Sequence, residues 1–354
     1  MFNSRFLKIP RDSKYNFDKN KFLRLDANER IIPFSNIDFR LLKKCITNYS
    51  LQAYPTNRET VAKLIAKKEK ISIDQVSITP GADSVLKYVF ELISHDKGEV
   101  LSVYPTYGMI DVYCKIYRKK HNKIYEYNLD SFLIKKNYSN ISLVYIAYPN
   151  SPSGKIISKN IILNIAKICK EKKILFVIDE AYIEYSKYDS LKDLLKKNNN
   201  ILIIRTYSKF FGLAGLRIGH IMCSKEIIQA INSIRPPHDI SNLSLKILEY
   251  FLKKKKDTYL SEFNKSKKYI KDYCLRKKFN FVLTEANFFH IFFDESKIKK
   301  VLLGLKKSNI LAKSNYLNFS NTLYKGPKNT VRVTIGSVKQ MKFFFNTLNK
   351  ITNS

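Results

Sequence analysis

The sequence predicts an α/β protein built around a mainly parallel sheet that is buried on both faces. The first observation is a set of short, uninterrupted apolar runs rich in β-branched residues, at 100–103, 143–147, 174–178 and 201–204. The second is that each run leads into a polar or Pro/Gly-containing segment, as strands do where open α/β sheets hold their reactive groups. The third is the presence of helical segments between strands, at 59–70 and 84–90. Further strands are expected at 75–79 and 218–223.

Length and composition place the chain among folded proteins with a large core. The 354 residues are enough for two domains, and 45% of them are hydrophobic. No run approaches about 18 apolar residues, and the first residues lack the pattern of a signal peptide. The five cysteines are odd in number and widely spaced, which argues against a disulfide framework or a zinc site. We therefore expect a cytoplasmic protein without a metal site and without membrane association.

The net charge of +34 raises nucleic acid as a possible partner. The lysines are spread over the whole chain, however, in short clusters such as Lys253–Lys256 on predicted solvated helix faces. This distribution indicates a general compositional bias, and we expect no nucleic-acid partner. A non-enzymatic basic binding protein stays open as an alternative, and steeply salt-dependent DNA affinity without a cofactor spectrum would support it.

The segment after the 201–204 strand carries the strongest chemical signal. Lys209 lies just past the carboxyl end of the strand, with Thr206, Ser208 and Arg217 around it. Two hydroxyls and a guanidinium could hold a dianionic phosphate, and a lysine placed this way can form a Schiff base with an aldehyde. The segment resembles the lysine loop of fold type I enzymes that use pyridoxal 5'-phosphate (PLP). It is most similar to that of histidinol-phosphate aminotransferases.

A carboxylate supports the same interpretation. Asp179 ends the apolar 174–178 strand, and a carboxylate there needs a cationic partner because burying it alone is costly. A protonated pyridine nitrogen would supply that partner and make the cofactor ring an electron sink. The resemblance implies that Tyr182 donates to the phenolic oxygen of the cofactor. The spacing of about thirty residues between Asp179 and Lys209 is the most specific pairing in the sequence.

Three further motifs resemble the cofactor-binding segments of this family. Ala82 and Asp83 follow a glycine at a strand-to-helix turn, where backbone N–H groups can bind an anion. Tyr107 corresponds to the tyrosine that stacks on the pyridine ring. The family has a second asparagine where this chain has Ser151, so either Ser151 or Asn150 is expected to contact the phenolic oxygen.

The resemblance also implies residues for the substrate and for a partner subunit. Asn28 lies in the N-terminal segment that begins the substrate cleft, and Tyr54 would reach the cofactor phosphate of a partner subunit. Arg332 presents a planar guanidinium suited to a carboxylate or phosphate. Ala312 stands where the family often has arginine, which weakens the inference to histidinol phosphate specifically. An exposed loop position is expected for His238, although it could also act as an acid or base.

Together these motifs imply a fold type I PLP-dependent enzyme with a mainly parallel seven-stranded sheet in a large domain. We expect this domain at residues 39–245, and a smaller α/β domain at residues 1–38 and 246–354. The implied activity is amino transfer, with glutamate as donor and a small phosphorylated ketone or aldehyde as acceptor, in a homodimer. The alternative is a PLP-dependent decarboxylase of a phosphorylated amino acid such as phosphoserine or phosphothreonine.

Overall fold

The computed structural model describes residues 6–7, 9, 18–95, 97–125, 138, 140–254, 259–314 and 329–353. Its strands are β1 (Leu23–Arg24), β2 (Val76–Thr79), β3 (Glu99–Tyr104), β4 (His121–Tyr125), β5 (Ile141–Ala147), β6 (Leu175–Asp179), β7 (Ile201–Thr206), β8 (Gly219–Met222), β9 (Phe281–Leu283), β10 (Phe288–Phe292), β11 (Ile310–Leu311), β12 (Lys313–Ser314) and β13 (Thr330–Thr334). Its α-helices are α1 (Asn36–Lys44), α2 (Asn48–Gln52), α3 (Arg58–Glu69), α4 (Gly81–Leu92), α5 (Met109–Ile116), α7 (Lys159–Glu171), α8 (Lys225–Ile234), α9 (Asn242–Lys253), α10 (Tyr259–Arg276), α11 (Glu295–Lys307) and α12 (Val338–Asn353).

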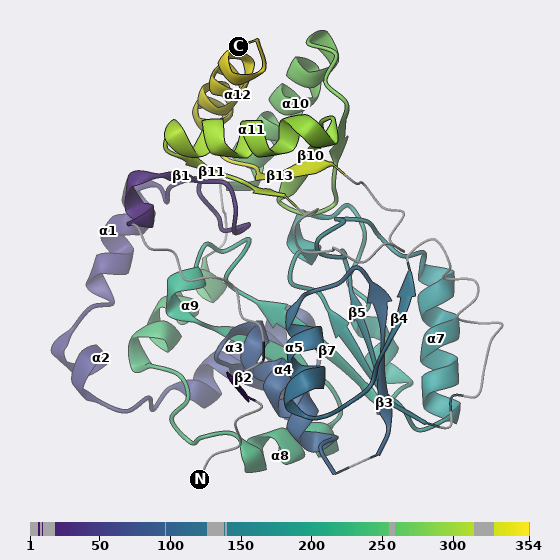
Figure 1. Ribbon diagram of the computed structural model, residues 1–354. Coiled ribbons are helices and arrows are strands. Elements are labelled where there is room, and N and C mark those ends of the chain that lie inside the picture. The colour runs from purple at the N-terminus through teal and green to yellow at the C-terminus, as the bar shows by residue number, and fades with distance from the viewer. Residues whose placement is uncertain are drawn as a thin grey trace.

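Seven of the described strands form one large sheet, in the order β2-β8-β7-β6-β5-β3-β4. The strands from β7 to β4 in this order run parallel to one another. β8 runs antiparallel to both of its neighbours, β7 and β2. The prediction of an α/β fold with a mainly parallel seven-stranded sheet is therefore confirmed (Figure 1).

Helices cover both faces of this sheet, which explains why its central strands are mostly apolar on both sides. Val144 and Ile146 of β5 pack in a cluster with residues of α7. Leu143 and Tyr145, on the opposite face of the same strand, pack in a cluster with residues of α4, α5 and α8. Because side chains alternate across a strand, a strand between two helical layers is apolar at most positions on both of its faces.

The edge strand β4 was not located from the sequence. It reads His-Asn-Lys-Ile-Tyr and is only partly buried, so it lacks the apolar run that marks the central strands. Among the described strands it pairs with β3 alone. An edge strand is exposed along one side and can therefore be polar, which removes the signal on which the sequence prediction depends.

A second, smaller sheet lies above the large one in Figure 1, beneath α10, α11 and α12. It has the order β12-β13-β10-β9 and is antiparallel throughout. Its core contains Phe288, Phe289, Phe344 and Phe345, all fully buried. The N-terminal strand β1 pairs in parallel with β11, which attaches the first segment of the chain to the C-terminal part.

The division into domains at 38/39 and 245/246 stays a prediction. Both points fall inside helices, α1 and α9. α9 packs on α3, with Leu245 and Leu248 in the same buried cluster as Val61 and Ile65.

No helix in the described part of the chain is both long enough and apolar enough to cross a membrane.

Candidate active site

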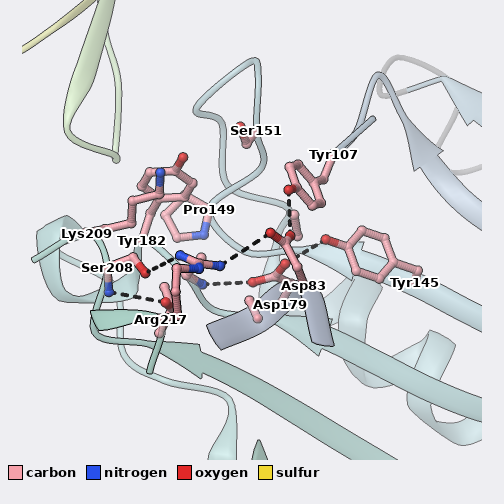
Figure 2. Close-up of a pocket in the computed structure, with 14 residues that line it drawn as sticks. Asp83, Tyr107, Tyr145, Pro149, Ser151, Asp179, Tyr182, Ser208, Lys209 and Arg217 are labelled. Carbon is pink, nitrogen blue, oxygen red and sulfur yellow. Dashed lines mark hydrogen bonds and ion pairs between the residues drawn. The ribbon is translucent and has the colours of Figure 1, made fainter. Parts of the chain in front are cut away.

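An open cleft lies at the carboxyl ends of β5, β6 and β7, beside the first turn of α4. Figure 2 shows the side chains that converge on it. The cleft is lined by Ala82, Asp83, Tyr107, Tyr145, Ala147, Pro149, Ser151, Asp179, Ala181, Tyr182, Thr206, Ser208, Lys209 and Arg217.

Lys209 lies in the loop that follows β7. Its Nζ donates a hydrogen bond of 3.1 Å to the carbonyl oxygen of Ala27, in the N-terminal segment. The same nitrogen lies 5.6 Å from the ring centroid of Tyr182. Lys209 is therefore held at the side of the cleft next to Tyr182, with its amine able to reach a ligand in the cleft.

Asp179 reaches the cleft from the end of β6 and is 6% exposed. Its Oδ1 accepts a hydrogen bond of 3.0 Å from the N–H of Ala181, and its Oδ2 accepts one of 2.8 Å from the Tyr145 hydroxyl. Burial raises the pKa of Asp179 to about 6, against the lowering effect of these two hydrogen bonds. Among the residues that the structure describes, no lysine or arginine forms an ion pair with it. A buried carboxylate without a protein cation fits a ligand that carries a protonated ring nitrogen.

Tyr182 presents a hydroxyl that is prepared to donate to or accept from a ligand oxygen. Asn28 Nδ2 donates to this hydroxyl over 3.1 Å. Burial acts to raise the pKa of Tyr182, but Lys209, Arg332 and hydrogen bonds from Asn28 and Ser151 outweigh it and lower the pKa. The phenol is thus stabilised in its ionised form, as suits a group that shares a proton with a ligand oxygen.

The groups expected to bind a phosphate come from α4, from the loop after β7 and from Arg217. Ala82 belongs to the first turn of α4, where backbone N–H groups and the helix dipole favour an anion. Arg217 lies 3.5 Å from the Ser208 hydroxyl, and Thr206 accepts a hydrogen bond from the Ser208 N–H. Gly81 has φ +74°, and a Cβ there would lie 2.9 Å from Arg217 Nη2, so glycine is needed for this approach.

Tyr107 stands over the cleft and is fixed by a carboxylate. Its hydroxyl donates to Asp83 Oδ1 over 2.6 Å, and the second oxygen of Asp83 lies 3.5 Å from Arg217 Nη2. Burial and the charge of Asp83 raise the pKa of Tyr107 far above its usual range. The ring therefore stays neutral and can stack on a flat heterocycle.

The donor set of this cleft matches PLP part by part: an amine for the aldehyde, a buried carboxylate for the ring nitrogen, and hydroxyls with an arginine for the phosphate. The sequence profile of class I and II aminotransferases matches residues 14–347. The chain belongs to the class I and II aminotransferase family. It is an aminotransferase whose cofactor is PLP.

One relative and two solved structures are similar to this chain over most of its length. A histidinol-phosphate aminotransferase from Pelagibacter ubique (strain HTCC1062) is 30% identical over 345 residues, covering 94% of this chain and 92% of that protein. The structure of the Sinorhizobium meliloti histidinol-phosphate aminotransferase in complex with PLP has a TM-score of 0.78 at 20% identity, covering 93% and 90% of the chains. The L-threonine-O-3-phosphate decarboxylase of Porphyromonas gingivalis has a TM-score of 0.76 at 16% identity, covering 94% and 99%. At these identities the two structures show a shared fold alone.

Most of the site residues predicted for this aminotransferase line the cleft. Ala82, Asp83, Tyr107, Ser151, Asp179, Tyr182, Thr206, Ser208, Lys209 and Arg217 all do so. Asn150 does not, because its Nδ2 donates to the carbonyl of Pro105 over 2.8 Å and to the Ser153 hydroxyl over 3.2 Å. Of the two candidates for the phenolic oxygen, the structure thus brings Ser151 to the cleft and uses Asn150 to hold the loop.

The predicted substrate residues lie next to the cleft. Arg332 is 9% exposed and donates to the carbonyl oxygen of Asp26 over 2.8 Å. Its guanidinium carbon lies 5.4 Å from the ring centroid of Phe288, whose ring meets that of Tyr182 edge to face at 5.8 Å. Asn28 has φ +54° and is fixed by Thr334 and Asn287. Neither residue lines the cleft itself, but Asn28 donates to the Tyr182 hydroxyl and the charge of Arg332 lowers the pKa of Tyr182.

Tyr54 lies outside the cleft of its own chain. It is 72% exposed, and its ring stacks on that of His238 with centroids 4.2 Å apart. Its predicted contact with a partner subunit stays a prediction.

Sequence reasoning missed Tyr145, Ala147, Pro149 and Ala181 as cleft residues. Tyr145 gave a detectable signal, since it is a hydroxyl in the middle of an apolar strand.

The described residues contain no cluster of three or more His, Cys, Asp or Glu side chains that could hold a metal ion.

Proposed function

We propose that this aminotransferase takes its amino group from glutamate and passes it to a small phosphorylated ketone or aldehyde. The observation that carries the proposal is the buried guanidinium of Arg332, which lies 5.4 Å from the ring centroid of Phe288 and whose charge acts on Tyr182 in the cleft. A planar guanidinium binds a carboxylate through two parallel hydrogen bonds. The name of the Pelagibacter relative supports a phosphorylated substrate.

Bound PLP supplies a reactive aldehyde and an electron-accepting ring. Lys209 would hold the aldehyde and would then act as the general base and acid that moves a proton from the substrate carbon to the C4′ carbon of the cofactor. Asp179 keeps the ring nitrogen charged. Tyr182 and Ser151 hold the phenolic oxygen, and Arg217, Ser208, Thr206 and the first turn of α4 hold the phosphate.

Glutamate is expected to convert the yellow enzyme to the pyridoxamine form. Arg332→Gln is expected to raise the glutamate KM by about 10- to 100-fold, because a lost hydrogen bond to a charged group costs about 1.5–3 kcal/mol. The measurement is the loss of visible absorbance against glutamate concentration. Arg276→Gln, on the remote helix α10, is the control and should leave KM unchanged.

Failure of glutamate to bleach the enzyme, while another amino donor succeeds, would contradict the donor assignment. Carbon dioxide release from phosphoserine or phosphothreonine without any keto acid would favour the decarboxylase instead.

We also propose that the enzyme is a homodimer with shared active sites. Apolar side chains stand exposed along α1, α2 and the segment after them, and such contiguous patches are uncommon on monomers. They are Ile37, Phe39, Ile46, Tyr49, Leu51 and Tyr54. α1 and α2 form one flank of the molecule in Figure 1, which suits a second copy of this chain.

Mixing two inactive variants tests this arrangement. Tyr54→Ala lacks the phosphate contact that we assign to the partner's site, and Lys209→Ala lacks the amine. A mixed dimer contains one site with both residues intact, so re-associated mixtures should recover about a quarter of the wild-type activity. The expected mass in solution is that of two chains. A monomeric mass, or no recovery from mixtures shown to contain mixed dimers, would contradict the proposal.

A further inference from the structure

Tyr145 is a buried hydroxyl that none of the roles above uses. It is fully buried on β5, among apolar neighbours of the α4 and α5 side of the sheet. Burial and the nearby charge of Asp179 raise its pKa well above the usual range, so it is a neutral phenol at any working pH. Its single O–H proton is directed at Asp179 Oδ2 over 2.8 Å, as Figure 2 shows. Tyr145 is therefore the donor and the carboxylate oxygen the acceptor.

Asp179 has two donors in the described structure, one on each oxygen. The N–H of Ala181 is a backbone group, so Tyr145 supplies the side-chain donor. Burial and the negative charges of Asp83 and Glu180 all oppose ionisation of this carboxylate. The two hydrogen bonds favour ionisation and so lower the pKa of Asp179. They also fix the plane of the carboxylate, so that its remaining lone pairs point in set directions.

Two proton positions compete when a pyridine nitrogen meets this carboxylate. The proton can stay on the nitrogen, giving an ion pair, or move to the carboxylate, giving a neutral pair. A hydrogen bond donated to the carboxylate is stronger when the carboxylate is ionised, so it favours the ion pair. The ring withdraws electrons from a substrate carbon only while its nitrogen carries the proton.

We propose that Tyr145 is a positioning residue that keeps the proton on the cofactor's ring nitrogen by donating its hydroxyl hydrogen to Asp179. The inference rests on the proposed contact between Asp179 and that nitrogen. It adds a second layer to the site, because Tyr145 acts through the carboxylate and not on the substrate.

The test uses the dimeric holoenzyme loaded with PLP that carries ¹⁵N in the ring. In Tyr145→Phe the ¹⁵N resonance should move toward the position of an unprotonated pyridine, and the affinity for PLP should fall about tenfold. Tyr185→Phe is the matched control. It removes another buried tyrosine hydroxyl, which forms a 2.9 Å hydrogen bond with the Tyr259 hydroxyl and does not line the cleft. This variant should leave the ¹⁵N resonance in place.

Asp179→Asn distinguishes the role of Tyr145 from the contact between Asp179 and the ring nitrogen. If this variant moves the resonance and Tyr145→Phe does not, the role of Tyr145 is overturned and the Asp179 contact stands. If neither variant moves it, both assignments fail. If Tyr145→Phe does not fold, 3-fluorotyrosine at position 145 replaces it and supplies a more acidic hydroxyl donor. At pH 5.5 Asp179 of the free protein is mostly protonated, so the stronger hydrogen bond to its ionised form should raise the affinity for PLP. An unchanged affinity there would overturn the proposal.

Discussion

Replacing Lys209 with alanine is expected to abolish the pH-dependent visible band of the Schiff base between enzyme and cofactor. It should also lower the transamination rate by at least about 10⁴-fold, since both the covalent attachment and the proton transfer depend on this amine. The structure gives the reason. Lys209 lines the cleft beside Tyr182, and none of the other residues lining the cleft is a lysine. Absorbance spectroscopy and single-turnover kinetics with glutamate measure the two losses.

Two controls sharpen the experiment on Lys209. Lys209→Arg keeps a positive charge but cannot form a Schiff base, so it should lose the absorbance as completely as the alanine variant. Lys225→Ala removes an exposed lysine that pairs with Asp74 at 3.7 Å, and it should leave spectrum and rate unchanged. A pH-dependent visible band retained by Lys209→Ala would place the reactive amine elsewhere.

The second large effect is expected from Asp179→Asn, which should lower the transamination rate by about 10²- to 10³-fold. The amide cannot form an ion pair with a protonated ring nitrogen, so the ring loses much of its capacity to accept electrons. The variant should still accept the Ala181 N–H, because its amide oxygen can occupy the position of Oδ1. Kinetics with glutamate measure this loss.

The same substitution should stabilise the protein when PLP is absent. Burial raises the pKa of Asp179 from 3.8 to about 6, so between these values the folded state binds more protons than the unfolded state. The free energy of unfolding of the wild-type apoprotein therefore falls as the pH rises through this window, by up to about 3 kcal/mol. Asp179→Asn does not titrate, so its advantage should be absent near pH 4 and complete above pH 7.

Denaturant unfolding of both apoproteins at pH 4, 5, 6 and 7.5 checks the sign. A difference that stays constant with pH would show that Asp179 is not a strained, buried carboxylate. Adding PLP should reverse the order of stability at pH 7.5, because the cofactor binds the wild-type site more tightly. The buried carboxylate of Asp179 thus lowers the free energy of unfolding of the apoprotein, a loss of stability that is common at active sites.

Two of the cleft residues were predictable because each follows an apolar run. Asp179 is the last residue of β6, and Lys209 lies in the loop after β7; both strands are marked by buried β-branched runs. Parallel strands bring their carboxyl ends to one edge, so a polar residue after each run must lie near the others. The local sequence was therefore sufficient to bring these two residues to one cleft.

Other positions depended on contacts between segments far apart in the chain. Asn150 and Ser151 are adjacent and both can donate a hydrogen bond, so sequence left the choice open. The carbonyl of Pro105 engages Asn150 and leaves Ser151 at the cleft. β4 was missed for a related reason, because an edge strand with one neighbour needs no apolar run.

The sequence by itself determined the α/β class, the central strands and most of the polar side chains that line the cleft. The strands could be located because burial between two helical layers makes most of their residues apolar. Only the tertiary structure decided that the Tyr145 hydroxyl donates to Asp179 and that the charge of Arg332 acts on Tyr182. Such pairings depend on which strands become neighbours and on the direction of each side chain, and neither is encoded within a single segment.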